Sequence, residues 1–155
     1  MNTRKLLLVA TIACFCSAIA CSAQSINMSG YAVWTHKGRA AGMSTTYITN
    51  HRPAGTISGT LVLRLWACRT PYTGGAFSGY KLAEGTLGQL RGGTYWYAPS
   101  VGGTWTVTTP GTFYIVMTLA EWTGSSWGVV DYVNFPPVRL GRTVPYQHTK
   151  SVYTN

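Results

Sequence analysis

Apolar and polar residues alternate along much of this chain. From Thr60 to Cys68 every second residue is leucine or alanine, and the residues between them include Arg64 and Trp66. A period of two predicts an extended strand with one apolar face. No useful stretch after the N-terminal region has the apolar spacing of an amphipathic helix. The pattern therefore predicts an all-β protein.

Short runs rich in Tyr, Thr and Val recur along the chain, separated by Gly, Pro, Ser and Asn. They predict strands at residues 31–35, 44–50, 60–68, 80–87, 94–97, 104–108, 112–122 and 127–135. Pro136 and Pro137 are expected to end the last strand, since proline donates no ladder hydrogen bond. About eight short strands at this spacing favour an antiparallel two-sheet β-sandwich, immunoglobulin-like or of related topology.

The last two predicted strands form a hairpin across residues 123–126. If Trp122 faces Trp127, then Glu121 opposes Gly128 and Thr118 opposes Asp131. This register places Glu121 and Asp131 on opposite faces of the sheet. Both strands are apolar on both faces, which predicts central strands covered on each side, or one face sealed by a loop.

The N-terminus has the layout of a secretory signal peptide. Arg4 and Lys5 precede an apolar run, and small residues follow as far as Ala23. The run is about 15 residues long against about 20 for a membrane span. We therefore expect a signal peptide at 1–23, a sandwich domain at 24–137, and a basic tail or edge strand at 138–155. The mature protein, with no transmembrane segment, is expected to be periplasmic or extracellular.

The cleavage position determines the fate of Cys21. Cleavage after Ala23 leaves Cys68 as the only cysteine. Cleavage before Cys21 would resemble a bacterial lipoprotein signal, with that cysteine acylated and anchoring the protein. Cleavage after Ala20 with Cys21 retained would allow a Cys21–Cys68 disulfide in an oxidising compartment. All three alternatives stay open from the sequence.

Positive charge is in excess, with 12 Lys and Arg against 3 Asp and Glu and a net charge of +9. Removal of Arg4 and Lys5 with the signal peptide lowers this to +7. The remaining cations are spread along the chain, with no run of five. A spread positive charge predicts attraction to an anionic glycan or cell-envelope polymer rather than specific nucleic-acid binding.

The scarcity of acids limits catalysis. A small hydrolase would have to combine a histidine with one of the few carboxylates, which are Glu84, Glu121 and Asp131. The histidines, at positions 36, 51 and 148, show no metal-site spacing, and no nucleophile elbow is present. Cys68, in an apolar strand, is expected to be a buried, inert thiol. We therefore predict no catalytic site, no metal and no cofactor.

Aromatic residues are the better candidates for binding. The chain has 6 Trp, and Tyr95, Trp96 and Tyr97 are consecutive in a predicted strand. Because consecutive side chains alternate between faces, at least one of these rings should point away from the core and could bind a sugar. Arg64 and Trp66 should share one face and could form a small cation–π surface.

Three segments carry a resemblance to a known type of module. They are GTLVLRLWACRTPYTGGAFSGYKLAEGTLGQLRGG (59–93), GTFYIVMTLAEW and VVDYVNF. Together they resemble an uncharacterised β-sandwich module of secreted bacterial proteins, often an accessory domain beside a hydrolase and without assigned catalytic residues. The resemblance implies a secreted, non-enzymatic binding module at a bacterial surface. The alternatives are the hydrolase above and an assembly subunit that pairs through an edge strand.

Overall fold

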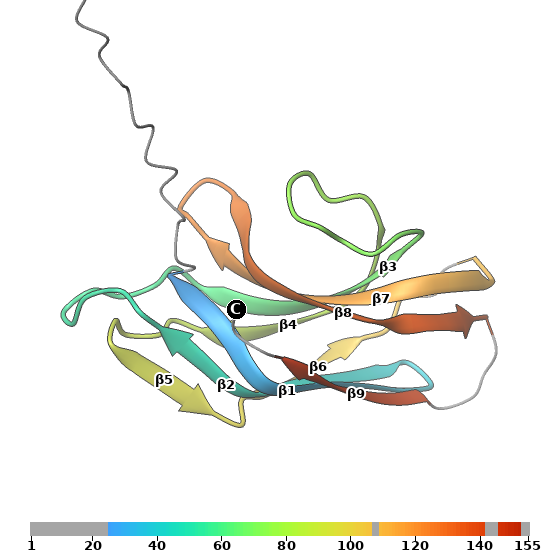
Figure 1. The fold of residues 1–155 in the computed structure, drawn as a ribbon, viewed down its shortest axis with the longest axis horizontal. Helices are drawn as coiled ribbons and strands as arrows, with labels where there is room; N and C mark the ends of the chain where they lie inside the picture. Colours follow the sequence, from blue (N-terminus) through green and yellow to red (C-terminus); the bar gives the residue numbers. More distant parts are fainter. Residues whose placement is uncertain (1–24, 107–108, 142–145, 153–155) are drawn as a thin grey trace, which may run out of the picture.

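Two antiparallel sheets pack face to face in this protein (Figure 1). The computed structural model describes residues 25–106, 109–141 and 146–152. Its strands are β1 (Ile26–Lys37), β2 (Ala40–Asn50), β3 (Leu61–Cys68), β4 (Tyr80–Gly88), β5 (Thr94–Tyr97), β6 (Ser100–Thr104), β7 (Gly111–Trp122), β8 (Trp127–Leu140) and β9 (Tyr146–Val152). The signal-peptide region, with Cys21, lies outside the described residues.

The five-stranded sheet has the order β5-β2-β1-β9, and β6 also pairs with β2. The four-stranded sheet has the order β4-β3-β7-β8. Every pairing between these strands is antiparallel. The predicted antiparallel two-sheet sandwich is therefore confirmed. None of the described residues belongs to a helix that could cross a bilayer.

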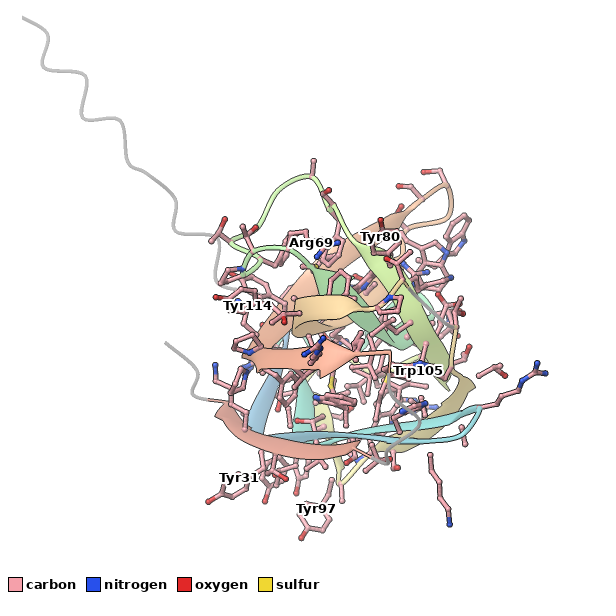
Figure 2. The ribbon with its side chains drawn as sticks, turned by 90° about the vertical axis from the view of Figure 1, so that its right-hand side faces the viewer. Tyr31, Arg69, Tyr80, Tyr97, Trp105 and Tyr114 are labelled. Atoms are coloured by element: carbon pink, nitrogen blue, oxygen red, sulfur yellow. The ribbon has the colours of Figure 1, made fainter. Side chains whose placement is uncertain are left out.

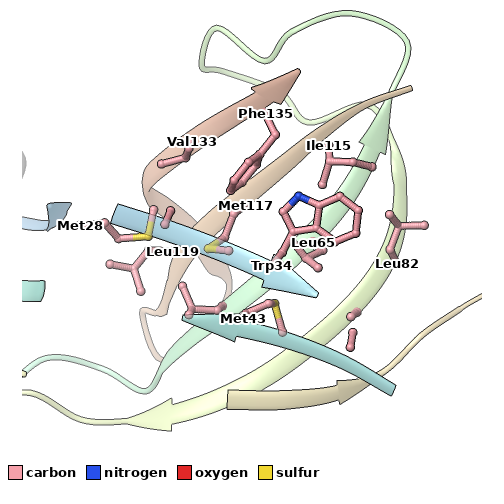
Figure 3. Packing of buried hydrophobic residues seen from close by; sticks show 14 of the residues in the cluster. Met28, Trp34, Met43, Leu65, Leu82, Ile115, Met117, Leu119, Val133 and Phe135 are labelled. Atoms are coloured by element: carbon pink, nitrogen blue, oxygen red, sulfur yellow. The ribbon is translucent and has the colours of Figure 1, made fainter. Parts of the chain in front are cut away.

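The core lies between the two sheets (Figure 3). The alternation seen from Leu61 to Ala67 places that face of β3 inward, as predicted. Trp34 of β1 is fully buried, stacks on Trp105 at 6.0 Å between ring centroids, and meets Phe135 edge-on. Packing large rings in preferred geometries gives this core much of its apolar contact area.

The outer face of the four-stranded sheet is covered by the chain itself. In the β3–β4 loop, Tyr72 and Phe77 lie against rings of the sheet, with Phe77 4.4 Å from Trp66 and Tyr72 4.8 Å from Tyr132. The Asn134 side chain holds the loop by exchanging two hydrogen bonds with the Tyr72 backbone. Central strand β7 is consequently buried on both faces, as predicted, but the prediction that both hairpin strands are central is wrong, because β8 is an edge strand whose outer face is at most half-buried.

Several predicted strand boundaries are wrong. Strands β1 and β2 begin earlier than predicted, at Ile26 and Ala40, and two later strands end elsewhere. Residues 104–108 were expected to be a strand, but β6 ends at Thr104 because Trp105 turns into the core; residues 107–108 lie outside the description. Strand β8 continues through Pro136 and Pro137 to Leu140. It tolerates them because β8 is an edge strand, where one side of the backbone needs no ladder partner.

The β7–β8 hairpin has the expected turn but a different register further along. Trp122 opposes Trp127 and Glu121 opposes Gly128, as predicted. A bulge then inserts one extra residue into β8, so that Asp131 opposes Leu119 rather than Thr118. The prediction that Glu121 and Asp131 lie on opposite faces is therefore wrong, because the bulge turns Asp131 inward.

One side of the sandwich closes by direct backbone contact between β4 and β6. A Cβ added at Gly103 would lie 2.5 Å from the Glu84 carbonyl oxygen, and one at Gly85 would lie 2.6 Å from Val101. Glycine at these two positions allows the edges of the two sheets to approach. The opposite side is formed by β8, β1 and β9, and β9 is the edge strand of the five-stranded sheet.

Candidate functional site

Four tyrosines extend from the five-stranded sheet toward solvent. We call Tyr31, Tyr47, Tyr95 and Tyr97 the tyrosine face. Their exposed fractions are 58%, 38%, 62% and 70%. Figure 2 shows Tyr31 and Tyr97 pointing away from the sandwich on the same side. Large rings exposed together on one sheet face are a candidate binding surface.

Strand pairing brings three of these rings into contact. Tyr97 of β5 lies directly opposite Tyr47 of β2, and Tyr95 lies opposite Thr49. The Tyr47 ring packs between the other two, with centroids 5.4 Å from Tyr97 and 5.7 Å from Tyr95. Contact with both neighbours fixes the Tyr47 ring and leaves outer surfaces of Tyr95 and Tyr97 accessible.

The Tyr-Trp-Tyr segment divides between the two faces of its strand. Trp96 opposes Ile48, which is fully buried, and packs against the core. Its two tyrosine neighbours face solvent. The sequence prediction that at least one ring points outward is confirmed, and the half-buried Trp96 does not belong to the tyrosine face.

A backbone irregularity places Tyr31 on this face. Gly30 has a positive φ of 82° beside a register shift in the β1–β2 pairing. The Tyr31 backbone N–H donates to Thr46 Oγ1 at 2.9 Å instead of to the ladder. A Cβ at Gly30 would lie 2.5 Å from Thr46 Cβ, so this packing requires glycine. Neither Tyr31 nor Tyr47 was singled out from the sequence, since their place on this face depends on strand pairing and on this irregularity.

Arg64 and Trp66 share the outer face of the four-stranded sheet, as predicted, but they do not pair with each other. The Arg64 guanidinium lies 4.5 Å from the Trp127 ring centroid and donates to Glu84. Trp66 Nε1 donates to Thr118 Oγ1 at 3.0 Å beneath the covering loop. The predicted cation–π pair of Arg64 with Trp66 is therefore wrong, because the Arg64 guanidinium lies over the ring of Trp127 in the β7–β8 hairpin.

Each carboxylate in the sequence has partners of its own. Glu121 accepts two hydrogen bonds from the Arg52 guanidinium, both at 2.6 Å, and one from the Gly59 N–H at 2.7 Å. The Arg52 hydrogen bonds hold the pKa of Glu121 below its ordinary value, against the opposing effect of burial. Both oxygens of the Glu121 carboxylate are therefore used in structural hydrogen bonds.

The other two carboxylates are also engaged. Burial alone would raise the pKa of Glu84, but hydrogen bonds from Arg64 and Lys81 lower it overall. Asp131 is buried and accepts hydrogen bonds from the backbone N–H groups of Met28 and Tyr132. The three acids of a hypothetical hydrolase therefore lie in three separate sets of contacts.

A hollow of about 520 Å³ opens beside the Arg52–Glu121 pair. Its walls come from residues 52, 59, 60, 89 and 121–124. The two charged groups in this hollow neutralise each other through their bidentate ion pair. We do not assign a ligand to it.

Among the side chains that the structure describes, His36, His51 and Cys68 each have separate surroundings. His36 stacks on Trp105 at 4.1 Å, and His51 Nε2 lies 2.8 Å from Asn27 Oδ1. The His148 side chain lies outside the described residues. Within the described ranges, no group of three or more His, Cys, Asp or Glu could hold a metal ion. Cys68 is a buried free thiol, and burial raises its pKa.

Comparison with known proteins adds nothing to this description. No protein-family model, curated protein or solved structure matches the chain. The tyrosine face is the arrangement of described residues that best fits a ligand surface, because its rings are both clustered and exposed.

Proposed function

We propose that this chain is a secreted, non-enzymatic binding module that acts at a bacterial surface and binds a glycan chain on its tyrosine face. The observation that carries the proposal is the ring cluster of Tyr47, Tyr95 and Tyr97, whose outer members are 62% and 70% exposed. Tyrosine offers an apolar ring for the C–H face of a sugar and a hydroxyl for its polar edge.

Neighbouring side chains on this face suit a hydroxyl-rich ligand. Ser29 opposes Tyr47 across the β1–β2 pair, and Thr49 opposes Tyr95 across the β2–β5 pair. Short hydroxyl side chains between tyrosines are the composition that antibody binding loops use for adaptable polar contacts. The rigid Tyr47 cluster also lowers the entropy lost on binding, since its rings already contact one another.

The charge distribution favours a neutral or anionic ligand. The three carboxylates of the sequence are Glu84 on the four-stranded sheet and the core-facing Glu121 and Asp131, so the tyrosine face carries none. With a net charge of +9 for the whole chain, a second copy of the protein would be repelled. A glycan is therefore favoured over self-association through this face.

Secretion and a bacterial surface are supported by sequence features alone. The charged, apolar and small-residue regions before Gln24 fit an export signal. The resemblance of residues 59–135 to modules of secreted bacterial proteins supports the same location. A surface module that lacks a catalytic centre would serve to attach its protein, or a partner, to a polysaccharide.

The test is binding to an array of immobilised bacterial and plant polysaccharides. We expect the wild-type chain to bind at least one glycan, and Tyr95→Ala with Tyr97→Ala to weaken that binding by about tenfold or more, since 1.4 kcal/mol corresponds to a factor of ten. Tyr80→Ala is the matched control, because Tyr80 is 53% exposed but belongs to the four-stranded sheet. Absence of any glycan signal, or an equal loss with Tyr80→Ala, would overturn the proposal.

A further inference from the structure

Three exposed cations, from two segments far apart in the sequence, lie at the same end of the sandwich. Strand β1 ends at Lys37, and Arg39 lies in the β1–β2 turn, while Arg69 follows the end of β3. All three are exposed. We call the surface formed by Lys37, Arg39 and Arg69 the basic end; Figure 2 views the molecule toward this end, with Arg69 and Trp105 labelled.

Backbone contacts connect the two sheets at the basic end. The Trp105 N–H donates to the Arg39 carbonyl at 2.9 Å, and the Thr106 N–H donates to the Leu82 carbonyl at 2.6 Å. Leu82 lies in β4, whose first residue, Tyr80, pairs with Ala67 just before Arg69. The β1–β2 turn and the end of β3 thus lie at the same end of the two sheets, joined through the segment around Trp105.

Arg69 is held in place by stacking. Its guanidinium lies 4.3 Å from the ring centroid of Phe113, which is fully buried. A Cβ at Gly111 would approach Arg69 Nη1 to 3.3 Å, so glycine leaves room for the guanidinium. A stacked guanidinium keeps its N–H groups available at its edges and loses little freedom when it binds an anion.

Carboxylates do little to offset this charge. Glu121 lies next to the last residue of β7, whereas the basic end is where β7 begins. Asp131 faces the core and bonds to the Met28 N–H. Glu84 is engaged by Arg64 and Lys81. The basic end therefore has a positive potential that its own acids do not neutralise.

We propose that the basic end is a second binding surface, separate from the tyrosine face, for an anionic polysaccharide that bears carboxylate or sulfate groups. The cations come from both sheets, so a polymer lying across the end would contact each in turn. Single-stranded nucleic acid is less suited, because Phe113 and Trp105 are 0% and 8% exposed and the exposed Tyr80 alone offers no row of rings for successive bases.

An anionic membrane is also less suited to the basic end. Interfacial binding normally inserts apolar or aromatic anchors beside the basic residues. Among the described residues, the large exposed hydrophobic side chain at this end is Tyr80, and the exposed Trp122 and Trp127 belong to the hairpin at the opposite end. One exposed tyrosine beside three cations gives little apolar area to insert into a membrane, so the basic end fits a hydrated polymer better.

The test is binding of the protein to heparin at several salt concentrations, with the wild type compared with the Arg39→Gln, Arg69→Gln double variant. We expect a five-fold or larger loss of affinity. The slope of log Kd against log salt should fall by roughly one to two, because each lost contact between a cation and an anionic group lowers that slope by about 0.7 to 0.9. The control Arg91→Gln, Lys150→Gln removes the same charge from exposed residues elsewhere and should retain most of the affinity.

Further variants separate the possible outcomes. Arg69→Lys keeps the charge and should bind nearly as well as wild type, and thermal unfolding checks that each variant is folded. On the neutral glycans of the array, the Arg39→Gln, Arg69→Gln variant should bind as well as wild type, so failure of the tyrosine-face proposal and failure of this one are distinguishable. Equal losses in the double variant and its control, or tighter binding to duplex DNA or phosphatidylserine vesicles than to heparin, would overturn the inference.

Discussion

The Asp131 carboxylate accepts a hydrogen bond of 2.6 Å from the backbone N–H of Met28, which lies 103 residues earlier in the other sheet. Asp131 also accepts a bond from the Tyr132 N–H, and it is only 8% exposed. The bulge in β8 directs this carboxylate inward. An acid that first suggested catalysis thus joins the two sheets on the side formed by β1 and β8.

Replacing Asp131 tests its structural role. Asp131→Ala should lower the free energy of unfolding by about 1 to 3 kcal/mol, because it leaves the buried Met28 N–H without this acceptor. Asp131→Asn retains an oxygen acceptor and should lose less. Urea denaturation followed by tryptophan fluorescence measures both. Equal stability of Asp131→Ala and wild type would show that the contact does not join the sheets energetically.

The Arg52–Glu121 pair predicts a dependence of stability on pH. Hydrogen bonds from Arg52 hold the folded-state pKa of Glu121 below its ordinary value of 4.5. The stabilisation is therefore complete above about pH 4.5 and is lost as the pH falls through the lower folded-state pKa. Glu121→Gln should be less stable at pH 7, and its stability should fall less between pH 5 and acid.

Denaturant midpoints measured at several pH values test this prediction. The pKa of Glu84 is lowered as well. Protonation of both Glu84 and Glu121 should therefore destabilise the wild type in acid, whereas the Glu121→Gln variant loses the contribution of Glu121. Glu84→Gln is the matched comparison, since its partners are Arg64 and Lys81. If the stability of Glu121→Gln and of the wild type falls equally with decreasing pH, the lowered pKa of Glu121 does not stabilise the fold.

Because the Tyr-Trp-Tyr segment is divided between two faces, substitutions at adjacent residues should change the free energy of unfolding by unequal amounts. Trp96 packs against the core, so Trp96→Ala should destabilise the fold by about 2 kcal/mol or more through lost packing. Tyr97 is 70% exposed, so Tyr97→Ala should change stability by no more than about 0.5 kcal/mol. Thermal unfolding of the two variants distinguishes them. The reverse order would mean that β5 presents its other face to solvent.

The closed edge between β4 and β6 predicts a position that requires glycine. Gly103→Ala would force a Cβ to within 2.5 Å of the Glu84 carbonyl oxygen and should cost about 1 to 3 kcal/mol. Gly102→Ala, one residue earlier, meets its nearest atom at 3.8 Å and is the control. If chemical denaturation finds the two variants equally stable, the sheets do not approach as closely as described.

The Cys68 thiol should react slowly in the folded protein. It is buried, and burial raises its pKa, so the reactive thiolate is scarce at neutral pH. Labelling with iodoacetamide, followed by mass spectrometry, should be slow in buffer and fast in urea. Fast labelling in buffer would instead indicate that the segment around Gly79, where a Cβ would lie 2.8 Å from Cys68 Sγ, opens readily.

Short-range patterns in the sequence determined the strand content and the sheet faces. The alternation from Leu61 to Ala67 predicted which side of β3 is buried, and glycine and proline residues marked most of the turns. The Trp122–Trp127 hairpin was also predictable, because its turn is short and local. A period of two assigns a side chain to a face only while the strand stays regular.

Tertiary structure decided everything that depends on bulges or on distant pairing. A single extra residue in β8 moved Asp131 to the core side, and pairing between β2 and β5 brought Tyr47 to Tyr97, fifty residues apart in the sequence. Three of the cations spread along the chain, Lys37, Arg39 and Arg69, lie at one end because strands β1 and β3 end there. The sequence by itself thus determined the strands and the excess of positive charge. Their spatial partners, and therefore the candidate surfaces, follow from non-local contacts that no local pattern records.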